Sequence, residues 1–184
     1  FEALGWQGMR LLEELLSMIA EEIPLILDVK RGDIGETQRY YAAACYEVIG
    51  ADAVTLNPFM GRDTLEPFLE YADKGIYLLA VTSNPGAQDI EMRRVIQGSG
   101  SGVQTGSPGQ YVFEIVSEMI KEVPQGGLVV GLTNASGEVL GRIPDVPLLI
   151  PVVGAQGGDL AVLRGANRDA PVLVNVSRGI RYAD

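Results

Sequence analysis

With 184 residues, of which 47% are apolar, the chain is long enough for one domain with a sizeable core but short for two. Its net charge of -10 is not offset by any basic cluster, so nucleic-acid backbones and anionic membrane surfaces are not expected partners. Histidine is absent and Cys45 is the single cysteine, which excludes serine–histidine triads, histidine-ligated zinc and internal disulfides.

Short apolar runs rich in β-branched residues alternate with amphipathic stretches, which is typical of βα units that build a parallel sheet. In chain order, the patterns predict a helix over 6–20, a strand over 25–30, a helix over 36–49, a strand over 53–57, a helix over 63–72 and a strand over 76–83. A Gly/Ser-rich connection over 97–109 follows, then a helix over 110–122 and strands over 128–132, 148–153 and 172–176.

Two fold classes accommodate six such repeats. An open doubly wound sheet tolerates six strands, whereas a (β/α)8 barrel needs two more, expected before Phe1, and a closing helix, expected after Asp184. Composition does not distinguish these two fold classes, so the distinction depends on the sequence motifs. We expect a single domain over 1–184, truncated at both ends if it is a barrel. Short apolar runs and a start without a charged leader predict a soluble cytoplasmic protein.

The densest charge pattern, D-V-K-R-G-D-I-G at 28–35, stands at the end of the first predicted strand. Because strand side chains alternate, Asp28 and Lys30 are expected on one side, which at the mouth of a barrel is where catalytic groups gather. A carboxylate and an ammonium held together favour each other's charged forms, so the lysine would remain able to donate a proton. The alternative is a structural ion pair, which is the more common role of an isolated D-x-K pattern.

A second cluster lies near the C-terminus, where I-P-V-V-G-A-Q-G-G-D (150–159) closes one strand and V-N-V-S-R-G-I (174–180) closes the next. Glycine-rich backbone lets N–H groups approach an anion, and Arg178 would complete a clamp for phosphate. In barrels the phosphate site is often built from the loops after the last two strands. The alternative is that these glycines only make tight turns.

Four motifs follow one another along the chain: D-V-K-R-G-D-I-G-E-T, T-S-N-P-G-A, I-P-x-V-G-A-Q-G-G-D and S-R-G-I. In this order and spacing they resemble the orotidine monophosphate decarboxylase family over nearly the whole chain, most closely its branch with T-S-N-P-G-A. The resemblance implies an α/β fold, a (β/α)8 TIM barrel with strands 3 to 8 present here. It also implies decarboxylation of orotidine 5'-monophosphate (OMP) to UMP in pyrimidine biosynthesis, without metal or cofactor, by a homodimer with shared active sites.

The first motif would supply the catalytic residues of this family. The resemblance implies that Lys30 protonates C6 of the pyrimidine and that Asp28 lies beside the departing carboxylate. Asp33 would reach from the partner subunit into the neighbouring active site. Ile34 would line the pyrimidine pocket, and Thr37 would lie near the ribose.

The later motifs would supply the remaining substrate contacts, at Ser83, Pro151, Gln156, Ser177, Arg178 and Gly179. Ser83 resembles the family's serine that reads the amide edge of the pyrimidine. Gln156 resembles the side chain that closes onto the phosphate. Arg178, with the backbone around Ser177 and Gly179, would hold that phosphate.

Two other functions stay open. A related barrel with a D-x-K-x-x-D strand, such as a sugar-phosphate decarboxylase or aldolase, would bind Mg2+ through further carboxylates, and chelation by EDTA would separate it from a metal-free enzyme. The S-N-P-G-A and A-Q-G-G-D segments argue against it. The other is a phosphate-binding fragment without turnover, which the retained residues disfavour: Asp28, Lys30, Asp33, Gln156 and Arg178.

Overall fold

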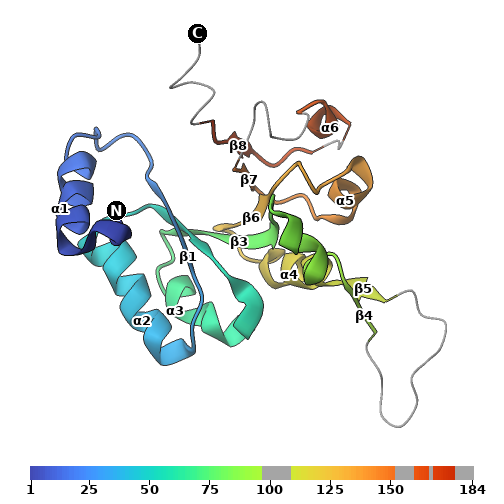
Figure 1. Cartoon of the computed structure of the whole chain (residues 1–184), viewed down its shortest axis with the longest axis horizontal. Coiled ribbons are helices and arrows are strands. Elements are labelled where there is room, and N and C mark those ends of the chain that lie inside the picture. The colour runs from blue at the N-terminus through green and yellow to red at the C-terminus, as the bar shows by residue number, and fades with distance from the viewer. Residues whose placement is uncertain (97–108, 152–159, 166–167, 177–184) are drawn as a thin grey trace.

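A single parallel sheet of six strands, in the order β1-β2-β3-β6-β7-β8, lies at the centre of the molecule (Figure 1). The computed structural model describes residues 1–96, 109–151, 160–165 and 168–176. The strands of the sheet are β1 (Ile26–Arg31), β2 (Ala53–Leu56), β3 (Gly75–Val81), β6 (Gly126–Val130), β7 (Leu148–Ile150) and β8 (Val172–Val174). Strands that succeed one another in sequence are neighbours in the sheet, as in a (β/α)8 barrel, whereas a doubly wound sheet reverses its order. The predicted barrel architecture is therefore confirmed.

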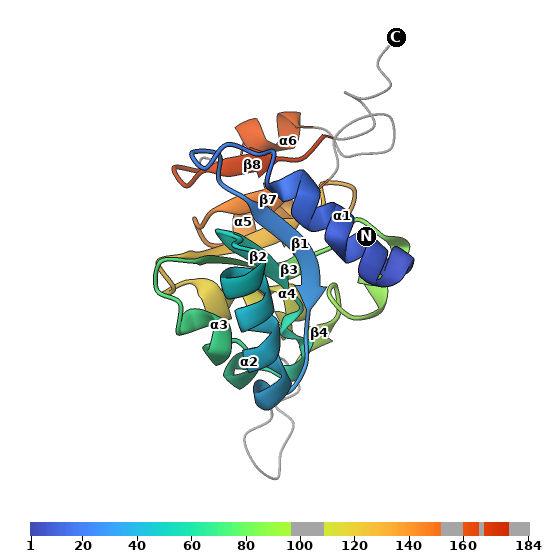
Figure 2. The same cartoon turned by 90° about the vertical axis from the view of Figure 1, so that its left-hand side faces the viewer.

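Helices precede or connect these strands. They are α1 (Gly5–Leu16), α2 (Gly35–Ala43), α3 (Glu66–Leu69), α4 (Val112–Ile120), α5 (Gly137–Arg142) and α6 (Ala161–Arg164). Helix α2 packs against α3, and α4 packs on β3 and β6. Figure 1 shows α1, α2 and α3 grouped toward one end of the sheet and α4, α5 and α6 toward the other, and Figure 2 views the first group.

The helix predicted over 6–20 is α1, which ends earlier, at Leu16, and two other predicted helices differ more from the observed ones. The helix predicted over 36–49 is α2 followed by a π-helical segment, Ala44–Val48, so its extent is confirmed but its geometry changes. The helix predicted over 63–72 shrinks to α3, preceded by a 3-10 turn at Arg62–Thr64. The physical reason is Pro67, which has no backbone N–H to bond to the residue four positions earlier and is tolerated only in the first turn of a helix.

A short antiparallel hairpin, β4 (Arg94–Val95) with β5 (Gln110–Tyr111), projects away from the sheet (Figure 1). The sequence patterns do not predict this hairpin, and they place residues 110 and 111 in a helix. Helix α4 begins at Val112 instead, where the Tyr111 backbone N–H donates to the Glu114 carboxylate at 2.7 Å. Most of the Gly/Ser-rich connection lies outside the described residues.

The core is built from apolar side chains of the sheet and of the helices that cover it. Leu78 and Leu128 on the sheet and Phe68 and Phe113 on helices are fully buried. Cys45 is also buried, and burial raises the pKa of its thiol. No helix in the described ranges combines the length and apolar character that crossing a membrane requires.

Candidate active site

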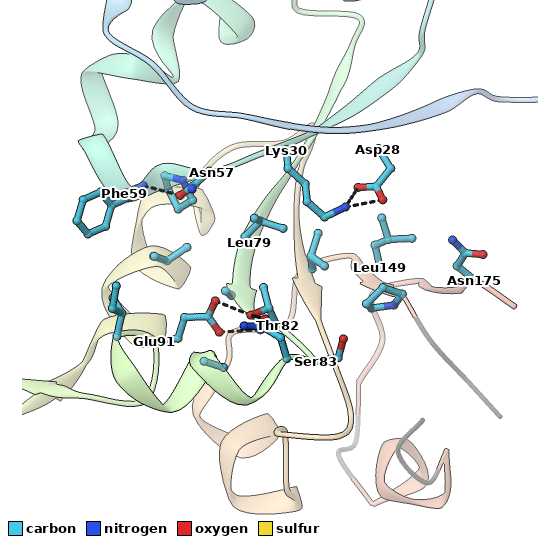
Figure 3. Close-up of a pocket in the computed structure, with 18 of the residues that line it drawn as sticks. Asp28, Lys30, Asn57, Phe59, Leu79, Thr82, Ser83, Glu91, Leu149 and Asn175 are labelled. Atoms are coloured by element: carbon cyan, nitrogen blue, oxygen red, sulfur yellow. Dashed lines mark hydrogen bonds and ion pairs between the residues drawn. The ribbon is translucent and has the colours of Figure 1, made fainter. Parts of the chain in front are cut away.

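A cavity of about 1100 Å3 opens at the carboxyl edge of the sheet (Figure 3). The end of β1, the loops after β2 and β3, and the ends of β7 and β8 all contribute to its lining. The apolar side chains of Leu79 and Leu149 lie within it, and polar side chains surround them (Figure 3). This edge is where (β/α)8 barrels place their active sites, so the cavity is the candidate site.

Lys30 and Asp28 form an ion pair at the end of β1, and both line the cavity. The Nζ atom of Lys30 lies 2.5 Å from each carboxylate oxygen of Asp28. Both face the same side of the strand, as alternation predicted. Their side chains are 50% and 55% exposed, so the pair contributes little to stability, about 0–1 kcal/mol. An ammonium has three donors, so Lys30 can bond Asp28 and a ligand together.

The segment after β3 that contains Ser83 is held by side chains from two other parts of the chain. Thr82 donates its backbone N–H and its hydroxyl to the two carboxylate oxygens of Glu91, each at 2.7 Å. The side-chain amide of Asn134, after β6, donates to the carbonyl oxygens of Thr82 and Asn84 at 2.7 and 3.0 Å. In Figure 3, Thr82 and Ser83 lie across the cavity from Lys30 and Asp28. Ser83 is thus presented by a preorganised loop.

Four predicted site residues, Asp28, Lys30, Ser83 and Pro151, line this one cavity. They come from three separate predicted motifs, so the fold brings together side chains that are distant in sequence. The other residues predicted to contact the substrate in the last two motifs lie outside the described residues: Gln156, Ser177, Arg178 and Gly179.

Three further predicted residues, Asp33, Ile34 and Thr37, are not among those lining the cavity of their own chain. Asp33 lies in the loop after β1, where its carboxylate accepts the backbone N–H of Ile34 at 2.8 Å. The Ile34 side chain is 62% exposed, and Thr37 lies in α2. A role for Asp33 in the site of a partner subunit stays a prediction.

Four polar residues beyond the predicted site residues also line the cavity: Asn57, Asn84, Glu91 and Asn175. Asn57 and Asn175 directly follow β2 and β8, and the signal that could have found them is a polar residue at the carboxyl end of a barrel strand. Glu91 carries no such signal, because it does not directly follow a strand of the sheet and its side chain is held at the cavity by hydrogen bonds from Thr82.

The fold and the cavity define a class of protein, a (β/α)8-barrel chain with a lysine–aspartate pair at the carboxyl edge of its sheet. Within that class, the chain belongs to the orotidine 5'-phosphate decarboxylase / HUMPS family, whose model matches residues 1–184.

Individual relatives agree with this assignment. Orotidine 5'-phosphate decarboxylase from Herpetosiphon aurantiacus is 41% identical over 186 residues, covering 100% of this chain and 66% of that protein. The structure of Leishmania donovani UMP synthase matches with a TM-score of 0.84 and 37% identity, covering 100% of this chain and 40% of that one. Leishmania donovani OMP decarboxylase matches with a TM-score of 0.81 and 33% identity, covering 99% and 70%. The chain spans just under two thirds of the length of the first curated relatives.

Proposed function

We propose that the protein is a cytoplasmic homodimeric enzyme that decarboxylates OMP to UMP in pyrimidine biosynthesis, without a metal or organic cofactor. The observation that supports this most is the Lys30–Asp28 pair on the wall of a cavity that Ser83 and Pro151 also line. The curated relatives are named orotidine 5'-phosphate decarboxylase, and one of them is 41% identical to this chain over its whole length.

The proposed mechanism uses Lys30 as electrostatic stabiliser and proton donor. The bond between C6 of the pyrimidine and its carboxylate carbon breaks, CO2 leaves, and the electron pair remains on C6. The Lys30 ammonium stabilises this carbanion as it develops and then transfers a proton to C6, and solvent restores the proton to the amine. Asp28, whose two oxygens each lie 2.5 Å from Nζ, holds the ammonium in place and itself lies beside the departing carboxylate.

The remaining substrate contacts are assigned by the same proposal. Ser83 reads the amide edge of the pyrimidine, Pro151 lies against the substrate, and the phosphate is held by Gln156, Ser177, Arg178 and Gly179. Pro151 and Asn175 support this, because both line the cavity, Pro151 lies within I-P-x-V-G-A-Q-G-G-D, and Asn175 lies two residues before S-R-G-I. Binding energy from the distant phosphate would then be used at the reacting carbon.

We expect the purified full-length protein to convert OMP to UMP at a rate that EDTA does not change. Among the described residues, no three histidine, cysteine or acidic side chains are grouped so that they could hold a metal ion. The assay follows UMP and CO2 release with EDTA, with added Mg2+, and with neither. Loss of activity in EDTA and its return with Mg2+, or turnover of a sugar phosphate in place of OMP, would favour the related barrel enzyme.

The proposed dimer places Asp33 in the active site of the other subunit. Asp33 is not among the residues lining its own cavity, and the adjacent Ile34 is an exposed apolar side chain. A Cβ on Gly32 would lie 2.8 Å from the Asn57 carbonyl oxygen, so the loops after β1 and β2 touch. Phe59 and Met60 follow Asn57 in a 3-10 turn and are also exposed, so the segments after both strands carry apolar groups that a partner could cover.

Mixing two inactive variants tests this sharing. Asp33→Asn and Lys30→Ala proteins are each expected to be nearly inactive. After subunit exchange at equal concentrations, half of the dimers are mixed and each has one intact site, so about a quarter of the wild-type activity should return. The matched control mixes Asp33→Asn with the double variant Lys30→Ala/Asp33→Asn, which cannot rebuild a site. No recovery in the first mixture, with exchange shown by mass-tagged chains, would contradict shared sites.

A further inference from the structure

Strand β1 is irregular at the point where it presents the ion pair. Leu27 pairs with Val54 and Arg31 pairs with Leu56, so β1 advances further than β2 between these two pairs. Lys30 has a φ of 48°, and within the described ranges it is the one residue other than glycine with positive φ. This conformation is unfavourable for a residue with a side chain and persists only where surrounding contacts impose it.

The side chain of Thr55, on β2, makes two contacts with this irregular segment. Its hydroxyl donates to Oδ1 of Asp28 at 2.8 Å and accepts the backbone N–H of Lys30 at 3.0 Å. Thr55 is fully buried, and a β-branched side chain has few rotamers, so the hydroxyl is held in one direction. One buried group therefore fixes the carboxylate of Asp28 and the backbone that bears the Lys30 ammonium.

The half-exposed Lys30–Asp28 pair needs such an anchor. Each side chain is about half open to the cavity, where solvent and rotamer freedom compete with the ion pair. Oδ1 of Asp28 accepts both the Thr55 hydroxyl and the Lys30 ammonium, so the orientation of the carboxylate sets the place of Nζ. Thr55 does not itself line the cavity, and a substrate would not touch it.

We propose that Thr55 is a positioning residue of the active site, which holds Asp28 and the left-handed backbone of Lys30 in the arrangement that aims the ammonium into the cavity. Its kinetic consequence rests on the proposed function, whereas its structural consequence does not. Misplacing a catalytic group by about 1 Å can lower a rate by about a hundredfold, so loss of this hydroxyl acts on the chemical step.

The kinetic test compares three variants of the full-length protein. Thr55→Val, which keeps the shape and removes the hydroxyl, is expected to lower kcat for OMP by roughly 10- to 100-fold while KM changes by less than about threefold. Thr55→Ser, which restores the hydroxyl, should recover most of the rate. Thr64→Val is the matched control, because Thr64 is also buried and donates to the Gly61 carbonyl oxygen at 2.7 Å but does not line the cavity. It should leave kcat unchanged.

Thermal unfolding of each variant identifies any that fail to fold, and Thr55→Ala, which adds no atoms, replaces Thr55→Val in that case. A crystal structure of the variant supplies a readout independent of activity. Lys30 should leave positive φ and the Asp28 carboxylate should rotate, and neither should change in Thr64→Val. An unchanged pair in the Thr55 variant, or equal losses of kcat in Thr55→Val and Thr55→Ser, would overturn the proposal. A wild-type protein inactive on OMP would contradict the proposed function, while the crystal structure would still decide the role of Thr55.

Discussion

Replacing Lys30 with alanine is expected to lower kcat for OMP by at least about a thousandfold and to leave the fold intact. The variant loses both a preorganised positive charge beside the reacting carbon and the proton donor, effects that are each worth roughly a hundredfold or more. Stability should change by less than about 1 kcal/mol, because the ion pair with Asp28 is half exposed. UMP formation gives the rate, and circular dichroism with thermal unfolding gives the fold.

Lys74→Ala is the matched control for Lys30→Ala. Lys74 also pairs with an aspartate, Asp52, at 3.6 Å, but it immediately precedes β3 and so stands at the opposite edge of the sheet from the cavity. This variant should retain the wild-type rate. Activity of Lys30→Ala within about tenfold of wild type, a barrier change of only ~1.4 kcal/mol, would be incompatible with the proposed chemistry.

Replacing Arg178 with alanine is expected to lower kcat/KM for OMP. The loss should correspond to roughly 2–5 kcal/mol of transition-state stabilisation, because breaking a buried charge-assisted pair costs about that much. The slow reaction of orotidine, which has no phosphate to bind, should barely change. Arg178 belongs to S-R-G-I, which begins two residues after Asn175, a residue of the cavity wall. Steady-state kinetics on OMP and on orotidine measures the difference between the two losses. A variant that acts only by destabilising the fold would lower both activities and could not produce this difference.

Arg164→Ala, an exposed arginine in α6, is the control and should change neither substrate's kcat/KM. If Arg178 only stabilised the end of a strand, its removal would lower the activity on OMP and on orotidine equally. Equal losses would remove the phosphate assignment, and with it the functional reading of S-R-G-I.

Much of the fold was predictable because strand signals are local. Each apolar run predicted as a strand contains or overlaps a strand of the sheet, as 53–57 does with β2. The errors have local causes too: Pro67 shortens α3, and the two-residue strands β4 and β5 are too short to leave a periodic pattern. The position of Asp28 and Lys30 on one face of β1 followed from alternation alone, even though Lys30 departs from regular strand geometry.

The sequence by itself determined the βα alternation, the family and the Lys30–Asp28 pair, because these depend on period and spacing among near neighbours in the chain. Only the tertiary structure decided the sequential strand order, the cavity that Lys30 and Ser83 share, and the part played by Thr55. In sequence, Thr55 is one β-branched residue in a buried strand, the commonest occupant of such a position. Its hydrogen-bond partners lie 25 and 27 residues away, and no local pattern records which distant groups a buried hydroxyl will meet.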